Sequence, residues 1–151
     1  MKISNATDSK DFKIKVEDGV GSININLLPG IYSLDATYVG DDIYGANSAK
    51  AVLDIQKVIL TFNFKPYTTI PENGVFTAVL KDMYGKRVEG QNASLDLYED
   101  GLYKTYYAVS DANGEANFMI DAPENIYFSI LNFDGSTWYK PSTNALTINI
   151  S

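Results

Sequence analysis

Residues 28–40 read LPGIYSLDATYVG, a turn followed by a segment in which apolar and polar side chains alternate. From Tyr32 onward the apolar members are Leu34, Ala36 and Tyr38, and Ser, Asp and Thr stand between them. Alternation of this kind places the apolar side chains on one face of a β-strand. The Pro-Gly pair marks the turn that leads into the strand. The stretch therefore predicts a half-buried strand entered from a turn.

The same pattern returns 95 positions later in the chain. Ile31-Tyr32 recurs as Ile126-Tyr127, and Gly40 recurs as Gly135. The further pairs at this spacing are Tyr38 with Phe133, Tyr44 with Tyr139, Leu53 with Ile148 and Ile55 with Ile150. A fixed period of this length indicates a structural repeat.

The period sets the expected domain boundaries. Residues 57–151 make up one whole period and predict a complete copy. Residues 1–56 predict the C-terminal part of a preceding copy, short of about 39 residues at its front. Only Gln56-Lys57 joins the two copies, and a link that short, without a Gly, Pro or Ser tract, predicts a stiff junction.

The remaining local signals are also strand signals. In the complete copy they predict strands near residues 58–64, 74–82, 93–99, 102–110, 115–120, 126–133 and 145–150. In the incomplete copy they predict strands near residues 12–17, 22–27, 31–38 and 49–55. No window carries an apolar stripe at helical spacing. The predicted fold class is all-β: immunoglobulin-like β-sandwich repeats, one complete and one N-terminally incomplete.

The composition argues against several classes of protein. Apolar residues make up 45% of the 151 residues, enough for a packed core. A net charge of −7, from 19 acidic and 12 basic residues, opposes binding to nucleic-acid phosphates or anionic lipid. The chain has no cysteine and no histidine, so thiolate zinc sites and the usual nucleophile–base pairs are missing, and we expect no enzyme. No apolar run approaches the roughly 18 residues of a membrane span.

Three motifs of the second copy extend the pattern: FTAVLKD at 76–82, GKRVEG at 85–90 and SDANGEA at 110–116. Together with LPGIY and ATYVGD of the first copy, they resemble the tandem immunoglobulin-like repeats of adhesin-like cell-surface proteins. The likeness is to the long repeat proteins of methanogenic archaea, related in style to the bacterial immunoglobulin-like domains of intimin and invasin. PENIY at 123–127 and FDGS at 133–136 depart from that family's loops but not from its strands.

The resemblance implies an extracellular location at the cell surface and no cofactor. The chain begins with polar sequence instead of a signal peptide, which for an extracellular protein predicts a piece of something longer. Its expected partners are adjacent repeats of the same protein.

Four residues are expected to have structural roles. Tyr32 and Tyr127 stand at the start of a strand, directly after a turn, which suits a tyrosine corner. In that arrangement the ring enters the core and the hydroxyl bonds to backbone across the turn. Gly40 and Gly135 open the next connection, where a positive φ is expected.

Calcium is the one metal for which the sequence offers candidates. Asp41 and Asp42 form one acidic pair, and Asp111 and Asn113 open a stretch that resembles the start of an EF-hand loop. The glycine of that stretch falls at the wrong position, and a hairpin turn explains the same residues equally well. No other cofactor is indicated.

Four tyrosines are candidates for a binding face: Tyr98, Tyr103, Tyr106 and Tyr107. An aromatic platform of this kind could hold a surface glycan or a protein partner. The alternative is ordinary cross-strand packing, because alternation turns half of the side chains on any strand outward.

Two kinds of covalent modification are conceivable from the sequence. Asn5 and Asn92 begin glycosylation sequons. Lys81 or Lys104 could supply the amine of an internal isopeptide bond, although the sequence pairs neither lysine with an acceptor.

The leading functional hypothesis is a stalk or spacer module that holds a distal binding domain away from the cell wall. The first alternative is direct recognition of a surface glycan or protein. The second starts from the expectation that residues 1–56 provide too few strands to close a sandwich. Either the sequence begins inside a repeat, or neighbouring copies complete it by donating strands, as subunits of a filament do.

Overall fold

The computed structural model describes residues 1–151, which divide into two compact units, Met1–Gln56 (unit 1) and Lys57–Ser151 (unit 2). Each unit is described by itself. Every regular element in both units is a β-strand. Nowhere does the chain form a helix that is long and apolar enough to cross a bilayer.

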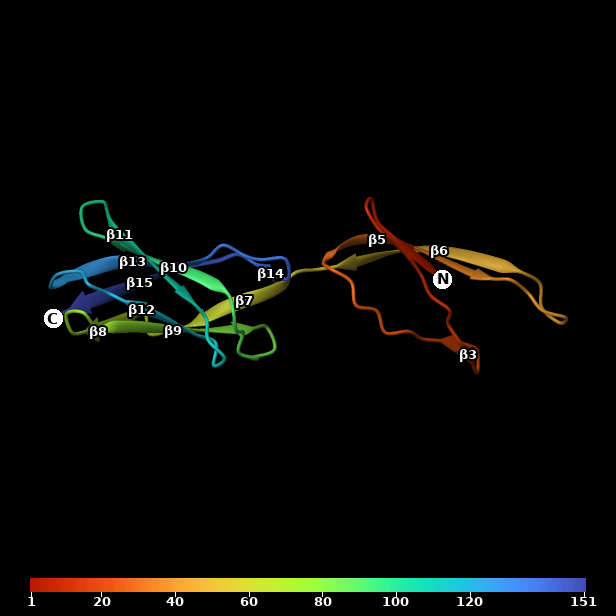
Figure 1. Cartoon of the computed structure of the whole chain (residues 1–151), viewed down its shortest axis with the longest axis horizontal. Helices are drawn as coiled ribbons and strands as arrows, with labels where there is room; N and C mark the ends of the chain where they lie inside the picture. The colour runs from red at the N-terminus through yellow and green to blue at the C-terminus, as the bar shows by residue number, and fades with distance from the viewer. The chain divides into compact units, whose positions relative to one another are not determined.

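Unit 2 contains nine strands. They are β7 (Val58–Asn63), β8 (Tyr67–Ile70), β9 (Val75–Asp82), β10 (Asn92–Tyr98), β11 (Leu102–Val109), β12 (Glu115–Met119), β13 (Asn125–Phe133), β14 (Tyr139–Lys140) and β15 (Ser142–Ile150). One sheet has the order β11-β10-β13-β15-β8, and the other has the order β12-β9-β7-β14. The two sheets form the two layers visible in Figure 1.

The chain of unit 2 crosses repeatedly between the layers. β9 and β10 lie in different sheets, as do β11 and β12, and then β12 and β13. Two layers of mainly antiparallel strands with such crossings are the immunoglobulin-like β-sandwich. The predicted all-β fold class is therefore confirmed.

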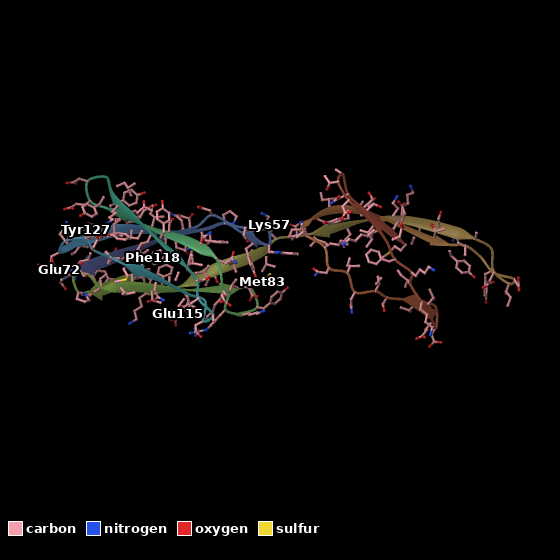
Figure 2. The ribbon with its side chains drawn as sticks, viewed as in Figure 1. Lys57, Glu72, Met83, Glu115, Phe118 and Tyr127 are labelled. Carbon is pink, nitrogen blue, oxygen red and sulfur yellow. The ribbon has the colours of Figure 1, made fainter.

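Alternating side chains of both sheets build the core of unit 2. On β9 the side chains of Phe76, Ala78 and Leu80 are buried, and those between them face outward. Phe76 stacks on Phe118 of β12 with ring centroids 6.2 Å apart, and Figure 2 shows Phe118 between the two layers. Burying a side chain of this size stabilises the fold by about 1.5–3 kcal/mol.

Two strands of unit 2 are absent from the sequence-based assignment. β8 was missed because it is only four residues long and lies between Pro66 and Pro71. Proline cannot donate to a ladder, so the first strand breaks at Pro66 and its continuation pairs with β15 of the opposite sheet instead. β14 has two residues, too few to produce an alternation.

Unit 1 contains six strands. They are β1 (Lys2–Ser4), β2 (Ser9–Asp11), β3 (Val16–Glu17), β4 (Val20–Gly21), β5 (Gly30–Tyr38) and β6 (Asn47–Ile55). Four of them form one sheet in the order β2-β1-β5-β6, while β3 and β4 form a separate small hairpin. The sheet is drawn in Figure 1 without a second sheet opposite it.

The sheet of unit 1 repeats half of unit 2 in the same register. The bounds of β5 and β13 differ by 95 positions (125 minus 30), and so do those of β6 and β15 (142 minus 47). Tyr32 lies opposite Leu53 as Tyr127 lies opposite Ile148. β1 pairs with β5 as β10 pairs with β13, and Ile3 thereby takes the place of Leu97.

Two predicted strands of unit 1 are wrong. Of residues 12–17 only Val16–Glu17 are paired, and residues 22–27 form no strand. In unit 2 the corresponding segment is β12, which pairs with β9. Unit 1 has no strand in the place of β9, so its alternating segment lacks a backbone partner.

Candidate functional site

Both expected tyrosine corners have the same hydrogen bond. The hydroxyl of Tyr127 donates to the carbonyl oxygen of Pro123 at 3.0 Å, and that of Tyr32 donates to the carbonyl oxygen of Leu28 at 2.9 Å. Both rings are buried, and Tyr127 also lies against Tyr103 with ring centroids 5.7 Å apart. Burial raises the pKa of Tyr127, with a smaller contribution from the charge of Glu99. Each hydrogen bond thus links a central strand, β13 or β5, to the turn that precedes it.

Gly40 and Gly135 form the same turn in the two units. Their φ angles are +86° and +89°. A Cβ at Gly40 would lie 3.0 Å from the carbonyl oxygen of Tyr44, and one at Gly135 would lie 3.2 Å from that of Tyr139. Both positions thus combine a left-handed backbone with close neighbours, which only glycine accommodates readily.

Asp41, the first calcium candidate, forms hydrogen bonds within its own turn. One carboxylate oxygen of Asp41 accepts from the amides of Ile43 and Tyr44 at 2.8 and 2.7 Å, and the other accepts from the Tyr38 hydroxyl. These hydrogen bonds, that of Tyr38 first, lower the pKa of Asp41. Asp42 beside it is exposed.

The second candidate pair lies in unit 2 and has the same local chemistry. Asp111 accepts from the amides of Asn113 and Glu115 at 2.8 and 2.9 Å. The chain does not bring three or more acidic side chains together as a metal site would. The hairpin-turn alternative accounts for the contacts of Asp41, Asp111 and Asn113.

The four candidate tyrosines do not share one face. Tyr106 points into the sandwich and is 8% exposed, whereas its neighbour Tyr107 is 80% exposed on the opposite side of β11. Tyr103 packs on Tyr127. Alternation separates Tyr106 from Tyr107, and the register shift between Leu97 and Tyr98 changes the pairing at the end of β10.

Tyr98 belongs to a different aromatic group. It lies opposite Phe128 on the outer face of the five-stranded sheet, with ring centroids 6.0 Å apart. Phe128 is 53% exposed. In unit 1 the same register positions hold Ser4 and Ser33, so the sheet itself does not require an aromatic pair there.

Sequence analysis missed a charged cluster that joins the two layers of unit 2. Lys104 of β11 contacts Asp121, which follows β12, with Nζ to Oδ1 at 2.7 Å. The Tyr106 hydroxyl donates to the same oxygen at 2.7 Å. The hydrogen bond from Lys104 and then that from Tyr106 lower the pKa of Asp121, and burial raises that of Tyr106.

This cluster also bears on the isopeptide hypothesis. Lys104 and Asp121 are both about half exposed and form an ordinary ion pair beside a shallow hollow of about 280 Å³. The pair links neighbouring edges of the two sheets, β11 and the end of β12. No sequence signal marks Asp121 as the partner of Lys104, because the two residues come together only through the packing of the sheets.

The sequon asparagines are both exposed. Asn5 lies in the turn between β1 and β2, where its side-chain oxygen accepts from the amides of Thr7 and Asp8. Asn92 begins β10.

The strand arrangement places unit 2 in the class of immunoglobulin-like sandwiches. No family model matches the sequence, and no curated protein matches it. Among solved structures, domains 4 and 5 of the S-layer protein SbsC match over 81% of this chain and 65% of that chain, with 12% identity and a TM-score of 0.37. Domains d3-d4 of the rat CD45 extracellular region match over 95% of this chain and 78% of that chain, with 12% identity and a TM-score of 0.34. Similarity at this level carries no argument about function.

Proposed function

We propose that the chain is a structural stalk or spacer module of an extracellular, adhesin-like repeat protein at the cell surface. The observation that carries the proposal is the exact recurrence of register: β5 and β6 pair as β13 and β15 do, 95 positions apart. Chains built from one repeated unit gain length by adding copies, and a spacer needs nothing else. A sequence without cysteine or histidine agrees with a role that involves no catalysis.

The connection between the copies favours rigidity. β6 ends at Ile55 and β7 begins at Val58, so two residues join the last strand of unit 1 to the first strand of unit 2. A linker of two residues gives the chain little freedom compared with the Gly- and Ser-rich linkers of flexible proteins. Repeated along an array, such links would keep a distal domain at a set distance from the surface.

Small-angle scattering on arrays of increasing copy number tests the spacer role. Each array joins copies of residues 57–151 without an added linker. Two residues then separate β15 of one copy from β7 of the next, as two residues separate β6 from β7 here. A stiff spacer predicts a maximum dimension that rises in proportion to the number of copies. Growth with the square root of the copy number would show freely jointed units and refute the proposal.

Direct recognition is a second candidate, and one observation favours it. The outer aromatic pair Tyr98 and Phe128 is partly exposed and stands where unit 1 has serines. Exposed aromatic rings offer an apolar face to a sugar ring or to a protein side chain. We propose this face, which includes only Tyr98 of the four tyrosines expected from the sequence, as the region to test for binding.

A glycan array discriminates the two functions. The chain and its variant Tyr98→Ser/Phe128→Ser, which takes the residues of unit 1, are compared on the same array. A spacer predicts no ligand for either protein. A ligand that the double variant loses, while Tyr107→Ala retains it, would establish recognition at this face.

A further inference from the structure

Two short sequences in the chain fit the acceptor pattern for N-linked glycosylation, an asparagine followed two positions later by serine or threonine. They are Asn5-Ala6-Thr7 in unit 1 and Asn92-Ala93-Ser94 in unit 2. Both asparagines are exposed. The sequence pattern and the exposure therefore do not distinguish the two sites, but their backbones do.

The first triplet lies entirely within the turn that joins β1 to β2. The two strands pair as far as Ser4 opposite Ser9, so the turn consists of residues 5–8. The amide of Asn5 donates to the carbonyl oxygen of Asp8 at 2.9 Å and closes the turn. All four turn residues are exposed and none has a ladder partner. An enzyme can therefore bind this triplet without opening a sheet.

The side chain of Asn5 is folded over its own triplet. Its Oδ1 accepts from the amides of Thr7 and Asp8 at 3.0 and 2.7 Å, and from the Thr7 hydroxyl at 3.2 Å. These hydrogen bonds form an Asx turn and leave the amide nitrogen, Nδ2, without a partner. Hydrogen bonds to the oxygen stabilise the negative charge that collects there when Nδ2 loses a proton. The turn thus makes this nitrogen easier to deprotonate.

The second triplet belongs to β10, which lies between β11 and β13 in its sheet. Ser94 pairs on both sides, with Tyr107 and with Asn132. Ala93, the middle residue, is only 4% exposed. The extended backbone holds Ser94 about 6.6 Å along the strand from Asn92, and no turn brings the two together. Presentation of this triplet in a turn requires β10 to separate from its neighbours.

The repeat does not need an asparagine in the turn between β1 and β2. Ile3 has the register position of Leu97, so Asn5 corresponds to Glu99. The turn of residues 99–101 joins β10 to β11 without an asparagine. The acceptor triplet is thus an addition to this turn and not a requirement of the fold.

We propose that Asn5 accepts an N-linked glycan in the folded chain and that Asn92 does not. The donor is a lipid-linked oligosaccharide, whose first sugar is joined through its anomeric carbon to a polyprenyl phosphate. Nδ2 of Asn5 forms a bond to that carbon, while the bond from the carbon to the phosphate oxygen breaks. The lipid phosphate leaves with the electron pair, and Nδ2 gives one proton to a base of the transferase.

This inference rests on the surface location in the proposed function, because transfer of this kind takes place on the outer side of the membrane. The test uses a purified oligosaccharyltransferase with its lipid-linked oligosaccharide, chosen because it glycosylates two free peptides, residues 1–11 and residues 89–97. Both triplets are then acceptors for the enzyme when no fold constrains them. The folded full chain is treated in the same way, and intact mass with peptide mapping locates the glycan.

We expect one glycan per folded chain, at Asn5. Thr7→Val should reduce its attachment by about 10-fold or more, because the hydroxyl of the third residue is part of the recognised pattern. Asn92→Gln is the matched control and should leave the yield unchanged.

Two results would overturn the proposal. The first is a folded chain that stays unmodified at Asn5, and the second is modification of Asn92 at a rate equal to that of Asn5. Neither result affects the scattering of arrays of residues 57–151, which do not contain Asn5. Failure here is therefore distinguishable from failure of the spacer role.

Discussion

Single hydroxyl groups hold the turns of this molecule to its central strands. Replacing Tyr127 by Phe removes the hydrogen bond to Pro123 and leaves that carbonyl without its partner. We expect a loss of about 1 kcal/mol in the free energy of unfolding of unit 2. Urea titration followed by the fluorescence of Trp138, the only tryptophan, measures it. Tyr84→Phe is the control, since Tyr84 is 81% exposed, and an equal loss there would contradict the corner.

Another residue-scale prediction concerns acid stability. Hydrogen bonds from Lys104 and Tyr106 hold the pKa of Asp121 below its usual range in the folded state. A folded pKa below the unfolded value stabilises unit 2 above about pH 4, and this contribution is lost as the pH falls through the lowered pKa.

Asp121→Asn should therefore lower the urea midpoint at neutral pH and make its decline below pH 4 shallower, with little difference from the native chain at the acid end. Urea midpoints across the pH range provide the measurement. Glu72→Gln is the control, because Glu72 is exposed and forms no ion pair or side-chain hydrogen bond. If the urea midpoints of both variants fall with pH as that of the native chain does, the cluster does not stabilise the sandwich.

Among the elements, β8 and β15 lie where a pulling force acts. β8 follows β7, the first strand of unit 2, and β15 is its last strand. The two are parallel, from Tyr67 opposite Thr147 to Ile70 opposite Ile150. Force applied at the two ends of unit 2 shears such a pair, so its hydrogen bonds resist together. The amide of Thr147 donates to Pro66 and that of Ser151 to Ile70, so alternate residues of β8 face β15.

Proline substitutions test this clamp. Thr68 lies between the two bonded positions and directs its N–H toward β15, whereas the N–H of Thr69 points away. Thr68→Pro should lower the unfolding force in single-molecule pulling, and Thr69→Pro should lower it less, because only the first removes a ladder bond. Equal unfolding forces for the two variants would show that the hydrogen bonds between β8 and β15 do not resist the pulling force.

How well a strand can be predicted from the sequence depends on its length and on the strands with which it pairs. β5, β6, β13 and β15 were placed within a few residues because nine-residue strands carry a clear alternation. β8 was missed because four residues between prolines carry almost none. Residues 22–27 alternate well yet form no strand, because pairing depends on a neighbour that no local pattern reveals.

The same limit applied to the candidate site. The tyrosine corners and the turn glycines were predictable, because their geometry lies within a few residues of sequence. The Lys104–Asp121 cluster and the outer pair Tyr98–Phe128 depend on which strands become neighbours. Neither could be read from spacing alone.

For the whole molecule, one relation supports the proposed spacer role: residues 30–55 and 125–150 fold as the same two-strand unit in the same register. Solution NMR on the full chain tests it most directly, through cross-strand backbone contacts. We expect Tyr32 opposite Leu53 and Leu34 opposite Ala51, matched by Tyr127 opposite Ile148 and Ser129 opposite Leu146. A register displaced by one residue in either unit, or the absence of strand contacts over residues 30–38, would contradict the account.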